Sequence, residues 1–278
     1  MNILFPTDMS EASQKSFWAA LDLARHMQCG VTLLHVYDQP VLLDSVSETG
    51  VDAMSDTLLS NMEKAQRERL HSFRQQLETT YQPGVHIEEV LRYGLPAHET
   101  AREAEESGSA YIVVSVRHMG KVERLLFGSM VNGLLHKTHV PVLTIPEEMP
   151  LRHFHKICYA TDFTFDDNPL IDKLLHFARM YGATVHCVHI HDSNLDTESA
   201  ILQDFQKTYQ QEVAGGLLSF HLVESLNVVD GLVQFIENHD IDLVAMLKQR
   251  RYWLDFFSGS HTKRMAFHGR TPLLVFHE

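Results

Sequence analysis

The sequence predicts an α/β protein of two tandem domains, each a five-stranded parallel sheet covered by helices. Three observations point to this fold class. The chain has 278 residues, which is room for two domains of ordinary size. Motifs of the amino-terminal half return in the carboxy-terminal half. Short apolar runs alternate with amphipathic stretches, which is typical of a parallel sheet with helices on both faces.

An internal repeat relates the two halves and is the strongest of these observations. The matched pairs are ILFPTD at 3–8 with ICYATD at 157–162, VTLLHVYD at 31–38 with VHCVHIHD at 185–192, and PVLTI at 141–145 with PLLVF at 272–276. The first two pairs are 154 residues apart and the third is 131 apart, so the second copy lacks 23 residues between Asp38 and Tyr111. We therefore expect one domain at 1–148 and a second at 153–278.

The first strand and helix are clearly marked. The run ILFPT at 3–7 has the continuous apolar character of a buried strand. Ser10 can cap the next helix, which is expected to end at Gly30. Its buried face is expected to carry Phe17, Leu21, Ala24 and Met27.

The other elements of the first copy continue the alternation of strands and helices. Strands are predicted at 31–37, 85–93, 111–116 and 141–145, with helices near 53–80, from Pro96 to about Ser107, and from Gly128-Ser129. In the long helix, the core stripe is expected to include Leu58, Met62 and Ala65. The carboxyl ends of parallel strands are where ligands bind.

Charge and composition exclude several classes of function. The net charge is −13, from 36 acidic against 23 basic residues, which argues against a general binder of nucleic acid or acidic membranes. Three scattered cysteines do not make a disulfide framework or a cysteine-rich zinc module. The amino terminus has no basic segment followed by an apolar one, and no uncharged run of about 18 residues occurs. We expect a cytoplasmic protein.

Polar residues at the predicted strand ends are the candidate site. Gly128-Ser129 begins a helix after a loop, where backbone N–H groups can hold a phosphate, although Ser129 can equally serve only as a helix cap. Asp8 can accept hydrogen bonds from a ribose or base edge, or cap the next helix. A zinc site at Cys187, His189 and His191 is not expected, because the repeat places these residues in a buried strand.

Taken in order, these motifs resemble a tandem member of the universal stress protein family. The resemblance rests on Pro6-Thr7-Asp8 followed by Ser10-Glu11, on LLHV at 33–36, and on RLLFGS at 124–129 before Pro141. It implies Rossmann-like domains of the adenine-nucleotide-binding hydrolase-like kind, which pair through their last strands. The two repeats are thus expected to pack as a pseudo-dimer, and a homodimer of chains is open.

The resemblance also implies a nucleotide site. The family's loop motif is Gly-x2-Gly-x9-Gly-Ser/Thr, and in the first copy Ser115 and His118 stand at its first two glycine positions. In the second copy Met246 and Gln249 stand there. The implied nucleotide-binding residues are Pro6, Thr7, Asp8, Val36, Ser115, Arg117, His118, Gly128, Ser129 and Met130. A second site would use Thr161, Asp162, Ile190, Gly259 and Ser260.

Two functions are left open at this point. The first is a stress-response regulatory protein that binds ATP or AMP in its first domain, with Mg²⁺ only alongside ATP, and whose second domain is mainly structural. The second is an interaction module that binds no nucleotide and acts through dimerisation. Basic residues of the 117–124 loop can replace the missing glycines as anion ligands or be solvated surface charges. No catalytic residue is expected, since neither Ser129 nor Ser260 lies in a Gly-x-Ser-x-Gly turn; slow incidental ATP hydrolysis is left open.

Overall fold

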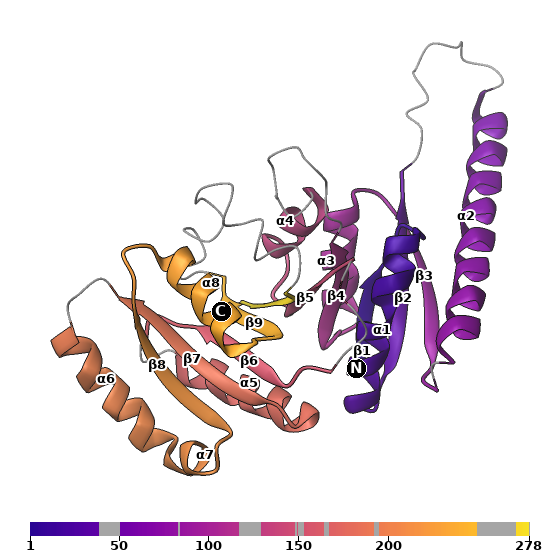
Figure 1. Ribbon diagram of the computed structural model, residues 1–278. Coiled ribbons are helices and arrows are strands. Elements are labelled where there is room, and N and C mark those ends of the chain that lie inside the picture. The colour runs from indigo at the N-terminus through magenta and orange to yellow at the C-terminus, as the bar shows by residue number, and fades with distance from the viewer. Residues whose placement is uncertain are drawn as a thin grey trace. The chain divides into compact units, whose positions relative to one another are not determined.

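The computed structural model describes most of the chain and shows two compact units. Described are residues 1–38, 51–82, 84–116, 129–147, 149, 153–163, 167–191, 195–248 and 271–277, without the side chains of 51–58, 129 and 195–200. One unit comprises residues 1–114 and 129–138, and the other comprises 115–128 and 139–278. The strands and helices of the first repeat alternate as the sequence predicts (Figure 1). In the second repeat two helices in succession, Leu195–Thr208 and Gln210–Ala214, stand between two strands.

The first unit contains a parallel sheet in the order β3-β2-β1-β4. Its strands are β1 (Asn2–Pro6), β2 (Gly30–Tyr37), β3 (Ile87–Tyr93) and most of β4 (Tyr111–Val116). Its helices are α1 (Glu11–His26), α2 (Val51–Tyr81), α3 (Pro96–Glu106) and α4 (Ser129–Leu135).

Helix α1 packs on β1 through its apolar face. Of the four residues expected there, Phe17, Leu21 and Ala24 are buried, whereas Met27 follows the end of the helix and is half-buried. Phe17 is fully buried and its ring meets that of Phe5 edge to face, with 5.1 Å between centroids. The Ser10 side chain accepts a hydrogen bond from the Ser13 amide, which confirms the predicted cap. The expected end of the helix is wrong by four residues. The helix ends at His26, and Gly30 is the first residue of β2.

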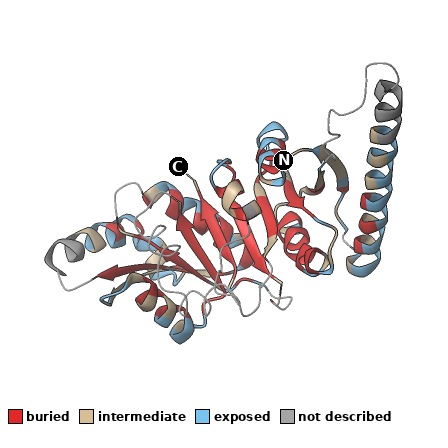
Figure 2. Ribbon diagram, turned by 90° about the horizontal axis from the view of Figure 1, so that it is seen from above, coloured by how far each residue is buried: buried red, intermediate tan, exposed pale blue. Residues whose placement is uncertain are grey.

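Helix α2 is longer than the strand it covers. Its 31 residues span about 46 Å at the usual helical rise. The seven residues of β3 span only about 23 Å. The core face is therefore confined to the half that ends at Tyr81, where Leu70, Phe73 and Leu77 are buried (Figure 2). The stripe expected about three turns earlier is wrong at two of its three residues, because Met62 is half-buried and Ala65 is exposed. The side chain of the third, Leu58, lies outside the described part of the chain.

The second unit contains a sheet in the order β5-β10-β9-β6-β7-β8. Its strands are β5 (Val142–Pro146), β6 (Lys156–Ala160), β7 (Thr184–His191), β8 (Leu218–Glu224), β9 (Leu243–Leu247) and β10 (Leu273–Phe276). Its helices are α5 (Asn168–Tyr181), α6 (Leu195–Thr208), α7 (Gln210–Ala214) and α8 (Val228–His239). The strands of the second repeat, β6 to β10, are all parallel, as predicted. The shorter pair α6 and α7 stands where the first repeat has α2, which fits the shorter second copy.

Strands β5 and β10 are the last strands of the two repeats, and they pair antiparallel. Leu274 lies opposite Leu143, its own counterpart in the repeat, and both are fully buried. Because the register is centred on two equivalent residues, these two strands are related by a local twofold axis between them. The predicted pairing through the last strands is confirmed at this contact.

Candidate functional site

The carboxyl ends of β1 and β2 gather four of the predicted site residues. Pro6 pairs in register with Leu34, and the Thr7 amide donates a hydrogen bond of 2.8 Å to the Leu34 carbonyl. Thr7, Asp8 and Val36 therefore lie at one edge of the sheet. Thr7 is buried, Val36 is half-buried and Asp8 is exposed.

The turn that follows β1 is held by the side chain and the carbonyl of Thr7. The Thr7 hydroxyl accepts a hydrogen bond of 2.9 Å from the Met9 amide and forms a hydrogen bond of 2.7 Å with the Ser13 hydroxyl. The imidazole Nδ1 of His35 lies 2.8 Å from the Thr7 carbonyl oxygen. Since a carbonyl can only accept, this nitrogen carries the hydrogen. Met9 takes a positive φ of 59°, so the chain turns sharply and presents Asp8 at the edge.

The second repeat builds the same turn from the equivalent residues. His189 Nδ1 lies 2.9 Å from the Thr161 carbonyl, and the Phe163 amide donates to the Thr161 hydroxyl at 2.8 Å. Phe163 has a φ of 52°. Because both repeats contain it, this hydrogen-bonded turn is a structural feature of the fold. The strand histidines at 35 and 189 serve it, which the sequence alone does not reveal.

The two repeats differ beneath the turn. Asp167 stands where the first repeat has Ser13, and it is fully buried. Its carboxylate accepts hydrogen bonds from the hydroxyls of Tyr159 and Thr161. A buried carboxylate is tolerated only when such donors compensate for lost hydration. The Thr161 hydroxyl is thus directed into the core, and the residue has no exposed surface.

The residues predicted for the second site are less accessible than those of the first. Ile190, the counterpart of Val36, is buried, and Asp162, the counterpart of Asp8, is half-buried. Gly259 and Ser260 lie outside the described residues. Only Thr161, Asp162 and Ile190 of this predicted site can therefore be placed, at the ends of β6 and β7.

The predicted phosphate loop is described only at its two ends. Arg117, His118 and Gly128 lie outside the described residues. Ser115 is half-buried near the end of β4, and Ser129 is the first residue of α4, followed by the half-buried Met130.

Helix α4 lies very close to α3. A Cβ atom placed on Gly133 would come within 2.9 Å of the Ala97 Cβ, closer than such atoms normally approach. A glycine is thus needed at this point of α4. The close approach sets the position from which α4, and with it Ser129, begins.

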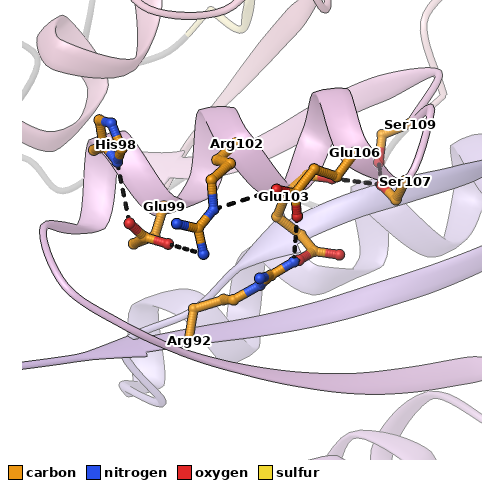
Figure 3. Close-up of polar contacts among 8 residues, drawn as sticks. All are labelled: Arg92, His98, Glu99, Arg102, Glu103, Glu106, Ser107 and Ser109. Carbon is orange, nitrogen blue, oxygen red and sulfur yellow. Dashed lines mark hydrogen bonds and ion pairs between the residues drawn. The ribbon is translucent and has the colours of Figure 1, made fainter.

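Helix α3 is in turn fixed to β3 by a network of ion pairs (Figure 3). Arg92 of β3 donates from Nε to Glu103 at 2.6 Å and from a terminal nitrogen to Glu106 at 2.7 Å. The hydrogen bond to Glu103 is the main cause of the raised pKa of Arg92. The carboxylate of the buried Glu99 forms an ion pair with the Arg102 guanidinium at 2.8 Å, and it lies 3.1 Å from His98 Nδ1. Sequence reasoning missed this network, although the spacing of Glu99, Arg102 and Glu106 along one helix face is a visible signal.

The histidine-rich strand β7 has structural roles at the positions considered for zinc. The His189 ring stacks on Phe163 with 5.4 Å between centroids. Burial raises the pKa of the Cys187 thiol well above its usual range, which disfavours the thiolate that metals bind. Within the described ranges, no group of three or more His, Cys, Asp or Glu side chains is arranged to hold a metal ion. Nor is any described helix both long and apolar enough to cross a membrane.

Comparison with known proteins decides the family. The sequence model of the universal stress protein family matches residues 1–146 and again 153–277. The chain belongs to the universal stress protein family. Its sequence is similar to the universal stress protein YxiE of Bacillus subtilis (strain 168), with 28% identity over 144 residues. That alignment covers 51% of this chain and 97% of the relative, so the relative has the length of one repeat.

Solved structures of universal stress proteins match both repeats together. A universal stress protein from Archaeoglobus fulgidus DSM 4304 aligns with a TM-score of 0.74 at 20% identity, covering 99% of this chain and 98% of that one. A putative universal stress protein from Pseudomonas aeruginosa UCBPP-PA14 aligns with a TM-score of 0.61 at 17% identity, covering 99% and 92%. At these identities the likeness shows the fold, and the predicted tandem α/β fold is confirmed.

Proposed function

We propose that this universal stress protein is a regulatory protein of the stress response whose first repeat binds an adenine nucleotide, ATP or AMP. The observation that carries the proposal is the turn at Thr7-Asp8. It holds an exposed carboxylate beside the end of β2, at the edge where parallel α/β sheets bind their ligands. Asp8 would accept hydrogen bonds from the ribose, and the Val36 backbone would meet the adenine.

The phosphates would lie beside the loop that joins β4 to α4. The full set of proposed contacts is Pro6, Thr7, Asp8, Val36, Ser115, Arg117, His118, Gly128, Ser129 and Met130. Two family glycines are replaced here, by Ser115 and His118, so cationic side chains such as Arg117 would supply part of the anion binding. Mg²⁺ would accompany ATP only.

The second repeat is proposed to be mainly structural. Its Thr161 hydroxyl is bonded to the buried Asp167, and Ile190 is buried where Val36 is half-buried. Met246, at the first family glycine position, is a core residue of β9. Among the described residues, Thr161, Asp162 and Ile190 are thus each less exposed than their counterparts Thr7, Asp8 and Val36.

The proposed role is regulatory because ligand binding can select one arrangement of loops or partners over another without chemistry. Such a ligand shifts the population only by the difference between its affinities for the two arrangements. No catalytic residue is assigned in this proposal. Any hydrolysis of ATP would be slow and incidental to this role.

Calorimetry with ATP and with AMP tests the proposal directly. Wild-type protein is expected to release or absorb heat with a stoichiometry of one nucleotide per chain and to melt at a higher temperature with ligand. The variant Asp8→Asn removes the charge yet keeps an oxygen that can accept from the Ser10 amide, so the fold should survive. Asp162→Asn is the matched change in the second repeat. Binding should weaken in Asp8→Asn only.

Two results would contradict this assignment. Loss of binding in Asp162→Asn with normal binding in Asp8→Asn would move the site to the second repeat. No heat and no stabilisation at millimolar nucleotide would leave the interaction module that acts through dimerisation. Light scattering would then measure the oligomeric state. The edge of β10 is already paired on both sides, with β9 and β5, so a dimer would have to use other surfaces.

A further inference from the structure

Three histidines cluster on the α8 side of the sheet in the second unit. His186 lies on β7, His221 on β8, and His239 is the last residue of α8. Their ring centroids are 5.3 Å apart for His186 and His221, 5.8 Å for His221 and His239, and 6.3 Å for His186 and His239. The counterparts in the first repeat are Thr32, Val90 and Gly108, so the cluster belongs to the second repeat alone.

The cluster extends from His186, the third residue of β7, to His221, which lies opposite Val188 in the middle of β8. The aromatic ring of Phe235 covers it, stacking on His239 at 3.9 Å and lying 4.9 Å from His221. His239 Nδ1 donates to the Phe235 carbonyl at 2.9 Å. These rings are therefore the surface through which the last turn of α8 packs on the sheet.

The contacts between the His186 and His221 rings can accommodate only a few hydrogens. His186 Nδ1 and His221 Nε2 face each other at 3.2 Å, a distance that suits one hydrogen between them. The Ser219 hydroxyl reaches both nitrogens, at 3.0 and 2.8 Å, and it has a single hydrogen to give. Protonating both imidazoles would point two N–H groups at each other. The folded arrangement thus requires that at least one of these rings stays neutral.

A cation beside the cluster also opposes protonation. The Lys156 ammonium donates to the His239 carbonyl at 2.8 Å, which places this positive charge next to His239. Asp242 accepts from the backbone amides of His155 and Lys156. Within the described part of the chain, none of the three imidazoles forms an ion pair with a carboxylate. The remaining charged groups on the elements packed there are Glu224, Asp230, Glu237 and Asp240.

We propose that His186, His221 and His239 form a proton-sensitive contact that holds the last turn of α8 on the sheet at neutral pH and weakens on acidification. The sign follows from the two states. Burial, with the neighbouring histidines, lowers the pKa of His221 to about 4 and also lowers the pKa of His186. In an opened state these imidazoles would titrate near their ordinary pKa of about 6.5. Stability of the contact is therefore complete above that value and is lost as the pH falls toward the folded pKa.

Hydrogen exchange followed by mass spectrometry tests this on the full chain. Protection of α8 against exchange is compared at about pH 7.5 and about pH 5.5, after correction for the intrinsic exchange rates. EDTA is present to remove metal ions. Helix α1 of the first unit is the internal reference. Because His221 takes up a proton more readily in the opened state, its contribution alone should make α8 protection about tenfold lower at about pH 5.5 than at about pH 7.5. Protection of α1 should change little.

Two variants separate the cluster from general effects of pH. The double variant His186→Thr with His221→Val installs the residues of the first repeat. In this variant the protection of α8 should fall between about pH 7.5 and about pH 5.5 no more than that of α1. His176→Asn removes an exposed histidine of α5 in the same unit and should retain the larger loss of protection in α8. An equal loss in wild type and in the double variant, or no loss in wild type, would overturn the proposal.

A titration of the wild-type imidazoles by NMR gives a second readout that needs no substitution. At least one imidazole of the cluster is expected to stay neutral until well below the ordinary histidine pKa of about 6.5. If all histidines titrate together, the proposal fails. Stoichiometric zinc that raises α8 protection at neutral pH would likewise overturn it, because the cluster would then be a metal site.

Discussion

The Tyr159 hydroxyl donates a hydrogen bond of 2.6 Å to the buried carboxylate of Asp167. In the first repeat the same two positions are Phe5 and Ser13. The two differences belong together, since a hydroxyl at 159 has a use only when an acceptor stands at 167. The interior of the second repeat thus contains a polar pair where the first has an aromatic ring and a serine.

This pair predicts a measurable coupling. Tyr159→Phe removes one donor from the buried carboxylate and should lower the free energy of unfolding by about 1–3 kcal/mol. Tyr159→Phe with Asp167→Ser installs the residues of the first repeat. It should cost less than the sum of the two single changes, because the second change removes the charge that the first leaves less satisfied. Urea unfolding of the four proteins measures the coupling, and strict additivity would contradict it.

The contact between Gly133 and Ala97 predicts a second effect. Gly133→Ala places a Cβ within 2.9 Å of the Ala97 Cβ, so α3 and α4 must move apart. Although alanine favours helix, overpacking of this kind typically costs about 1–3 kcal/mol. Adding Ala97→Gly should recover part of the loss in thermal unfolding. If Gly133→Ala is stabilising, the two helices are not held by this close approach.

Element order could be predicted from the sequence, because strands such as β1, β4 and β5 are short apolar runs and the segments between them are amphipathic. The strand predicted at 111–116 agrees with β4, and the pairing of the last strands follows from the apolar edges of PVLTI and PLLVF. The end of α1 could not be predicted from Gly30. The chain turns earlier, at Gln28, a non-glycine residue that adopts a positive φ of 52°.

The candidate site was predictable only as far as strand ends determine it. Thr7, Asp8 and Val36 gather because parallel strands end at a common edge, which the sequence pattern implies. The contacts of His35 with the Thr7 carbonyl and of His186 with His221 depend on which residues of neighbouring strands lie opposite each other. The apolar periodicity of a single sequence indicates on which face of the sheet each residue lies. It does not indicate which residue of the neighbouring strand lies opposite.

The Arg92 network predicts the cost of breaking a partly buried ion pair. The Glu103 side chain is 8% exposed, so Arg92→Met would leave its carboxylate without its main partner and should destabilise the first unit by about 2 kcal/mol. The exposed pair Arg67 and Glu63 is the control, and Arg67→Met should cost about 0.5 kcal/mol or less. Urea unfolding measures both. Equal costs would show that burial does not strengthen the Arg92 contacts.

The three cysteines are predicted to differ sharply in reactivity toward a thiol reagent. Burial raises the pKa of all three thiols, but Cys158 and Cys187 are fully enclosed in β6 and β7 whereas Cys29 is only half-buried. In the native protein at about pH 8 only Cys29 should react, and slowly, because its raised pKa leaves little thiolate. Its rate should rise with pH beyond the range in which an ordinary thiol levels off. In urea all three should react at once. Rapid native modification of Cys158 or Cys187 would contradict the packing of β6 and β7 described above, since no reagent reaches a side chain enclosed in an intact sheet.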